Sequence, residues 1–182
     1  MSSTTRLTLP PLPHWDDKTK RPANFERDKL PNLTFDYIRA KAPGQGIGLT
    51  ALLHGDDAHW LAPLMVDGTM PVVSPVMSYI TLYVSWPGYE DIMDDDMTDI
   101  PLFSLGDSGD PLDMTSLTRA EFARAVGGVV AMFILNRKIR CLKGTDPEWD
   151  LDGIELGDVV VSGIRHVFGQ VYQADIHIEK GT

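Results

Sequence analysis

The chain has 182 residues and a formal net charge of −10, and 43% of its residues are hydrophobic. That composition is typical of a globular protein and excludes a disordered or membrane-embedded chain, and the length suits one domain with its own core. The single cysteine, Cys141, excludes an intrachain disulfide and a zinc site built from several cysteines of one chain. The first residues lack the apolar stretch of a signal peptide, and no apolar run reaches the roughly 18 residues of a membrane span. We therefore expect a cytoplasmic protein with no membrane partner.

The charge is distributed unevenly along the chain. Residues 1–41 contain eight Lys or Arg and five Asp or Glu, whereas residues 42–118 contain twelve Asp or Glu and no basic residue. Phosphate backbones bind to clustered cations, so the acidic middle of the chain argues against a nucleic-acid partner. It favours a basic or polar partner, a metal ion or the chain's own basic N-terminal residues. The alternative is a solvated acidic surface that promotes solubility.

Residues 1–32 are predicted to form an extended arm beside a single globular domain of residues 33–182. Leu9–Pro13 reads Leu-Pro-Pro-Leu-Pro, and proline favours the polyproline II conformation in itself and in the residue before it. This segment is either a ligand for an aromatic-lined groove or an extended stretch that Trp15 anchors to the domain.

The first part of the domain predicts short elements. Residues 33–42 predict a short helix, and residues 47–53 and 61–66 predict short strands or buried loop. Residues 76–86 predict a longer strand, and residues 90–114, rich in Asp, Gly and Pro, predict a long acidic loop. The alternation within the longer strand places one apolar set on a single face: Val76, Ile80, Leu82, Val84 and Trp86.

A long amphipathic helix is predicted over residues 118–143. Thr118 and Glu121 have the spacing of a capping box, in which each side chain binds the other residue's backbone amide. Two central glycines, Gly127 and Gly128, each cost about 1 kcal/mol relative to alanine, which predicts a close crossing by another element. We expect that element to be the C-terminal hairpin. The apolar stripe comprises Phe122, Val126, Val129, Val130 and Phe133.

The C-terminal residues 158–179 predict a β-hairpin with a two-residue turn at Gly169-Gln170. That register assigns an apolar face to the core, with pairs Val161–Ile178, Gly163–Ile176, Arg165–Ala174 and Val167–Tyr172. It places His166, Asp175 and His177 on the opposite face, within roughly 5–8 Å of their neighbours. These three side chains are candidate catalytic acid/base groups or metal ligands. The alternative is a polar, half-solvated sheet face.

A second candidate metal site comprises His54, Asp57 and His59, because histidine and carboxylate are common ligands when thiols are absent. Their spacing differs from the i, i+4 pattern of a helical zinc motif. The alternative is a turn around Gly55, with Trp60 filling the core.

Three stretches carry a resemblance to known sequences. Ile80–Glu90, with Leu117–Ala123 opening a helix and Gly163–Gly169 in a closing strand, is similar to a pattern in uncharacterised proteins of mushroom-forming fungi. The resemblance implies no activity and no functional residues.

We thus expect an α+β fold, with an antiparallel sheet of about four strands and the 118–143 helix packed on one face. The leading hypothesis is a non-enzymatic interaction protein, monomeric or homo-oligomeric, that binds a basic or polar partner or a small molecule through its acidic 90–113 loop. The second hypothesis is a small, metal-assisted enzyme that uses the hairpin histidines, and the sequence identifies no cofactor. The partner-binding candidates are Trp86, Tyr89, Asp94, Asp95 and Asp96.

Overall fold

The computed structural model describes residues 4–8, 30–55, 57–72, 77–89, 97–105, 114–139 and 146–181. Most of the predicted N-terminal arm, the carboxylates Asp94–Asp96 and Cys141 lie outside these residues. The expectations that concern them stay predictions.

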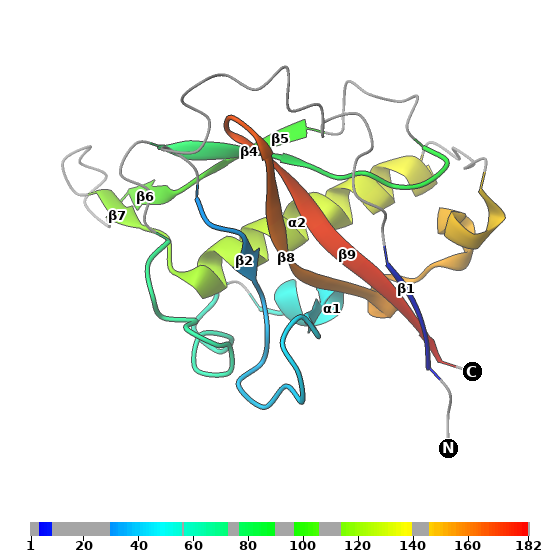
Figure 1. Cartoon of the computed structure of the whole chain (residues 1–182), viewed down its shortest axis with the longest axis horizontal. Helices are drawn as coiled ribbons and strands as arrows, with labels where there is room; N and C mark the ends of the chain where they lie inside the picture. The colour runs from blue at the N-terminus through cyan, green and yellow to red at the C-terminus, as the bar shows by residue number, and fades with distance from the viewer. Residues whose placement is uncertain are drawn as a thin grey trace.

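A mixed β-sheet forms one layer of the molecule (Figure 1). Its main path runs β2 (Leu33–Thr34), β8 (Val159–Phe168), β9 (Val171–Gly181), β4 (Tyr79–Tyr83) and β5 (Met97–Pro101). Two short strands extend it: β1 (Thr4–Thr8) pairs with β9, and β3 (Ile47–Gly48) pairs with β8. A separate two-stranded sheet joins β6 (Phe103–Leu105) and β7 (Met114–Ser116).

The prediction of about four antiparallel strands was therefore wrong in both number and direction. Among the residues that the structure describes, the main sheet has seven strands, and β4 runs parallel to β9. Two-residue strands such as β2 and β3 are too short to show an alternating pattern, so their pairing depends on contacts far along the chain. Residues 33–42, predicted as a helix, begin with β2, and Tyr37 forms an isolated bridge to Met65. The predicted 90–114 loop contains β5 and β6 among its described residues.

The long helix α2 (Arg119–Ile139) packs on one face of the sheet and is confirmed over the described residues (Figure 1). The capping box is present: Thr118 N–H donates to Glu121 Oε2 at 2.7 Å, and Glu121 N–H donates to Thr118 Oγ1 at 3.3 Å. Most of the predicted stripe is buried, with Val129 half-buried. The helix is therefore part of the structural core.

The two glycines of α2 differ in their surroundings. A Cβ built at Gly127 would lie 2.9 Å from Leu52 Cβ, in the short helix α1 (Leu49–Leu52), so close packing requires glycine there. A Cβ at Gly128 would meet nothing within 4 Å. A close crossing is thus confirmed at Gly127, but the crossing element is α1, and the expectation that it would be the hairpin was wrong.

The β8–β9 hairpin forms at the predicted turn, but its predicted register was wrong. Phe168 lies opposite Val171 as expected, and the register then shifts between His166 and Phe168 and again between Val161 and Gly163. Each shift adds one residue to β8, as in a β-bulge, and a one-residue slip moves side chains to the other face. The resulting pairs are His166–Tyr172, Arg165–Gln173, Ile164–Ala174, Gly163–Asp175 and Val161–Ile176.

Between α2 and β8, the described residues from 146 onward form three short 3-10 helices, η3 (Pro147–Trp149), η4 (Leu151–Gly153) and η5 (Leu156–Asp158). Trp149 and Leu151 are buried in the core. None of the helices that the structure describes is long and apolar enough to cross a lipid bilayer.

Candidate functional site

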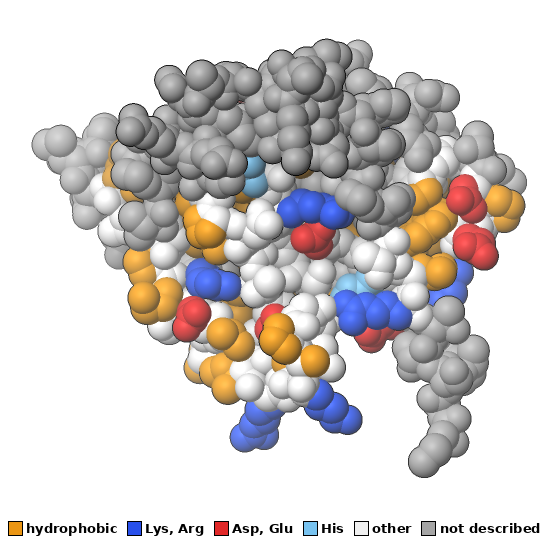
Figure 2. All heavy atoms as spheres, in the orientation of Figure 1, with side chains coloured by type: hydrophobic (Ala, Val, Ile, Leu, Met, Phe, Trp, Pro, Cys, Tyr) orange, Lys and Arg blue, Asp and Glu red, His pale blue; other side chains and the backbone are white. Residues whose placement is uncertain are grey.

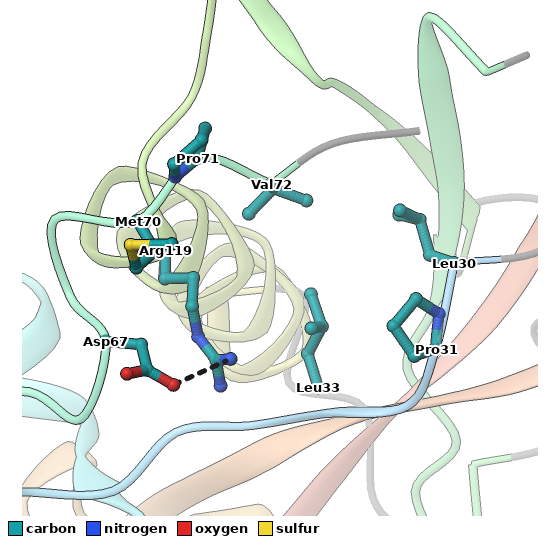
Figure 3. Close-up of a pocket in the computed structure, with 8 residues that line it drawn as sticks. All are labelled: Leu30, Pro31, Leu33, Asp67, Met70, Pro71, Val72 and Arg119. Carbon is teal, nitrogen blue, oxygen red and sulfur yellow. Dashed lines mark ion pairs between the residues drawn. The ribbon is translucent and has the colours of Figure 1, made fainter. Parts of the chain in front are cut away.

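A pocket of about 350 Å³ opens beside the start of α2 (Figure 3). Three segments that are far apart in the sequence meet around it: residues 30–33, residues 67–72 and the first residue of α2. Hydrophobic side chains gather on this side of the molecule (Figure 2). The pocket is lined by Leu30, Pro31, Leu33, Asp67, Met70, Pro71, Val72 and Arg119.

The first wall, residues 30–33, is held by β9 and β8. Leu30 N–H donates to the Tyr172 hydroxyl at 2.7 Å, and the same hydroxyl donates to Leu30 O at 3.2 Å. Tyr172 is fully buried, and burial raises the pKa of its hydroxyl to about 12, so the group stays protonated and keeps both bonds. Leu33 pairs with Ile164 in the β2–β8 ladder. This wall is therefore fixed before any ligand arrives.

The second wall, residues 67–72, is bound to the N-terminal turn of α2 and to Leu117, two residues before that helix. Gly68 O accepts from Ala120 N–H at 3.0 Å, Met70 O accepts from Arg119 N–H at 2.8 Å, and Val72 N–H donates to Leu117 O at 2.7 Å. Gly68 packs so closely that a Cβ there would lie 2.3 Å from the backbone oxygen of Ala62. The wall is therefore also fixed by the fold.

Arg119 provides the cation of the pocket and connects its two walls. Its Nη2 donates to Thr34 O at 2.7 Å, and its Nη1 lies 3.7 Å from Asp67 Oδ2, an ion pair beyond hydrogen-bonding distance (Figure 3). Its Nε is buried without a hydrogen-bond partner. The Arg119 side chain is 18% exposed, whereas that of Asp67 is 60% exposed. The guanidinium is thus largely desolvated and incompletely satisfied by the protein.

The backbone amides of this helix start are already occupied. Arg119 and Ala120 N–H bond the second wall, Glu121 N–H bonds Thr118 Oγ1, and Phe122 N–H bonds Thr118 O at 2.9 Å. The usual anion site of a helix N-terminus is therefore filled by the protein itself. An anion in this pocket would find the Arg119 guanidinium as its donor among the lining residues.

The structure places the three predicted catalytic side chains on different parts of the hairpin. His166 lies opposite Tyr172, with its ring edge against the Tyr172 ring at a centroid distance of 5.1 Å, and its Nε2 bonds Gly169 O. Asp175 and His177 alternate with Tyr172 along β9 and point to the other face. The structure thus separates His166 from Asp175 and His177, because the register shift between His166 and Phe168 places His166 opposite Tyr172 and not opposite Gln173.

The other two residues pair with different cations. Asp175 Oδ1 lies 2.9 Å from Arg165 Nε, in an ion pair whose N–H is not aligned for a hydrogen bond. Burial raises the pKa of Asp175, and the Arg165 charge partly offsets this. His177 is 1% exposed, and its Nδ1 accepts a hydrogen bond from Arg6 Nη2 at 2.9 Å.

Several groups around His177 act on its titration. Burial and then the Arg6 charge lower the pKa of His177, whereas Glu179, with Oε1 3.4 Å from Nε2, and the Gln45 backbone raise it. Since arginine only donates, the ring is neutral with Nδ1 unprotonated. His177 thus holds β1 against β9, and its position is structural.

The predicted metal ligands do not converge. The His54 ring packs edge-on against Trp60 at 5.5 Å, and Asp57 Oδ1 accepts from the backbone amide of His59 at 2.9 Å. The loop is fixed by Arg124, whose guanidinium donates to the carbonyls of Leu52, His54 and Gly55. Across the part of the chain that the structure describes, no three His, Cys, Asp or Glu side chains gather as a metal site would require.

The predicted partner-binding aromatics are in the core. Trp86 is buried and its Nε1 donates to Trp149 O at 2.8 Å, and Tyr89 is buried with its hydroxyl 3.3 Å from Asp150 Oδ1. As the chain is folded here, neither ring is presented to a partner. The carboxylates Asp94, Asp95 and Asp96 lie outside the described residues.

A second hollow, of about 420 Å³, lies between α2 and the β4–β5 pair. Gly128 opens onto it, and its described lining carries no charged side chain. It is lined by Val84, Thr98, Ala125, Gly128, Val129, Met132, Phe133 and Asn136.

Sequence reasoning missed Arg119 and Asp67 as site residues. Arg119 follows the capping threonine, and its type and position there also suit an exposed helix residue. The pocket is signalled neither by periodicity nor by a local motif, because its walls come from residues 30–33 and 67–72 and meet through tertiary contacts.

Comparisons with known proteins give no relatives: no family model, no curated protein and no solved structure matches this chain.

Proposed function

We propose that this protein is a non-enzymatic binding protein that holds a small, mostly apolar ligand in the Arg119 pocket. The observation that carries the proposal is a largely desolvated, incompletely paired guanidinium between two fixed apolar walls. Ligand sites typically combine an apolar cavity of roughly 300–1,000 Å³ with a few placed polar groups, and about 350 Å³ lies within that range.

The polar side chains that line the described pocket support binding more than catalysis. They are Arg119 and Asp67, and the described lining contains no histidine, cysteine, serine, threonine or lysine that could serve as a nucleophile or a proton shuttle. Preformed walls favour affinity because little conformational entropy is lost when a ligand binds.

The proposal is tested by blocking the pocket. We expect compounds from a library of small apolar molecules to shift the backbone amide NMR signals of Leu33, Val72 and Arg119 together and saturably. Met70 is an exposed lining residue, so Met70→Trp should fill the pocket and abolish the shifts while the protein remains folded. Leu64→Trp, at an exposed residue that does not line the pocket, is the matched control and should leave them unchanged. Shifts that persist in Met70→Trp, or a library without a single pocket binder, would contradict the proposal.

A partner surface in the acidic 90–113 segment stays a prediction alongside this proposal. Its carboxylates belong to a stretch of the chain without any Lys or Arg, which favours a basic partner. The expected signature is association that weakens with salt and is lost when Asp94, Asp95 and Asp96 are all replaced by Asn. Association unchanged at high salt and in that triple variant would contradict it.

A further inference from the structure

Resting on the proposed function, we propose that the ligand of the Arg119 pocket is a monocarboxylate with an apolar body, and that its carboxylate replaces Asp67 as the partner of Arg119. Three features of the site support it: the number of free donors, the weakness of the existing ion pair and the character of the walls.

The number of available donors limits the charge of the ligand. One guanidinium faces the pocket, and the amides at the start of α2 are bonded to Gly68 O, Met70 O and Thr118. A phosphate carries nearly two negative charges and three acceptor oxygens, which a single cation leaves mostly unsatisfied in an apolar pocket. A carboxylate carries one charge and fits the planar fork of arginine. The donor count therefore favours a carboxylate over a phosphate.

The existing partner of Arg119 is weakly held. Asp67 lies 3.7 Å from Nη1, and its side chain is 60% exposed, so water screens the pair strongly. Asp67 also has a positive φ of 53°, the one such value among the non-glycine residues that the structure describes. A ligand carboxylate between the apolar walls would be less screened than Asp67 and would bind the guanidinium more closely. Asp67 is thus a built-in competitor that a ligand can displace.

The walls define the rest of the ligand. Apart from Asp67 and Arg119, the described lining consists of two leucines, two prolines, a methionine and a valine. Their side chains offer van der Waals contact and no hydrogen bonds. In Figure 3 the apolar residues surround the space that the Arg119 guanidinium reaches from one side. The body of the ligand is therefore apolar, with its carboxylate at one end.

The experiment compares three probes that share one apolar chain: octanoate, octanamide and octyl phosphate. Affinities are measured by amide NMR titration on the full chain at pH 7.5. We expect octanoate to bind at least tenfold more tightly than octanamide, because a charge-assisted bond to Arg119 is added. Octyl phosphate should bind more weakly than octanoate.

Variants of Arg119 and Asp67 test whether these two residues cause the preference for octanoate over octanamide. In Arg119→Gln the octanoate-to-octanamide preference should fall to about one, with octanamide binding showing that the pocket is intact. Asp67→Asn should tighten octanoate binding about threefold and leave octanamide unchanged, because a competing carboxylate is removed. Arg165→Gln, which removes a cation outside the pocket, is the matched control and should change neither affinity.

The outcomes separate this inference from the proposed function. Octanamide binding as tightly as octanoate, or octyl phosphate binding more tightly, would overturn the carboxylate class while leaving the pocket as a binding site. Unchanged octanoate affinity in Asp67→Asn would overturn the role of Asp67. If Arg119→Gln binds neither octanoate nor octanamide, the octanoate affinity of Asp67→Asn is the measurement that tests the carboxylate proposal. Both proposals would be overturned if the three probes shift no amide NMR signals around Leu33 and Arg119 and no compound in the library of small apolar molecules binds the pocket.

Discussion

Two arginine–aspartate pairs in this protein have different surroundings. Arg165 and Asp175 lie on the outer face of the β8–β9 hairpin at 2.9 Å, where they form an ion pair between half-buried groups. Arg119 and Asp67 lie 3.7 Å apart beside a cavity of about 350 Å³ with apolar walls. The first pair is a close contact within the sheet, whereas the second leaves a desolvated guanidinium with an exposed, distant partner.

The difference shows that clustered titratable residues are a weak guide to a site. His177, beside Asp175, is the kind of residue that chemistry often uses, yet its Nδ1 is occupied by Arg6. The pocket contains no histidine among its described residues, but it has a cation that the protein does not fully satisfy. Unmet hydrogen-bonding capacity next to a cavity is the stronger indication of ligand binding.

The largest expected effect tests whether the pocket wall depends on close packing at Gly68. Gly68→Ala forces a Cβ against the backbone of Ala62 and should lower the free energy of unfolding by roughly 3 kcal/mol, measured by urea denaturation. Amide signals of residues 67–72 should shift, while those around Arg165 should not. Gly157→Ala, where a Cβ has open space, is the control with an expected change near zero. Equal stability of the two variants would show that the wall can relax.

A smaller effect is expected when the pH is changed, because the free energy of unfolding should depend on pH through His177 in the β8–β9 hairpin. The pKa of His177 is lowered by burial and by Arg6 from its ordinary value of 6.5, so the unfolded chain binds a proton more readily than the folded one. The contribution of His177 to stability is therefore complete above pH 6.5 and is lost as pH falls through the lowered folded-state pKa. The urea concentration at the midpoint of unfolding should therefore decrease as the pH is lowered from 7.5 to 5.5.

His177→Gln should remove this part of the pH dependence. Asp175, whose pKa is raised mainly by burial, acts in the opposite sense, because its folded form binds a proton more readily than the unfolded chain. An unchanged pH profile in His177→Gln, or pocket amides that titrate over the same range, would contradict the assignment to the hairpin.

Double-mutant cycles compare the two ion pairs directly. With alanine at each position, we expect a coupling energy of about 1 kcal/mol for Arg165–Asp175 and about 0.6 kcal/mol for Arg119–Asp67, because the second pair is longer and its carboxylate is more exposed. The measurement is the free energy of unfolding of each single and double variant. A larger coupling for Arg119–Asp67 would mean that Asp67 is a firm partner and a poor competitor for a ligand.

The smallest effect concerns the helix that carries Arg119. Gly128→Ala should stabilise the protein by about 0.7 kcal/mol, since a Cβ there meets open space and alanine favours a helix. Gly127→Ala should destabilise it, because its Cβ would clash with Leu52. Thermal unfolding measures both. Octanoate affinity should be unchanged in Gly128→Ala, and a change would show that the pocket senses the middle of α2.

The sequence by itself determined the features that depend on near neighbours. The capping box at Thr118, the apolar stripe of α2 and the turn at Gly169-Gln170 follow from residues a few positions apart, and all three are present. The alternation in residues 79–83 likewise placed Ile80 and Leu82 in the core. Local hydrogen bonding and periodicity specify such elements without knowledge of the rest of the chain.

Only the tertiary structure decided the features that depend on distant contacts. The register shift between His166 and Phe168 moved His166 away from Asp175 and His177, and strand registers of this kind are set by packing on both faces. The parallel pairing of β4 with β9 and the contact of Gly127 with α1 join segments far apart in the sequence. The Arg119 pocket has the same origin, because Tyr172 fixes one wall and the start of α2 fixes the other.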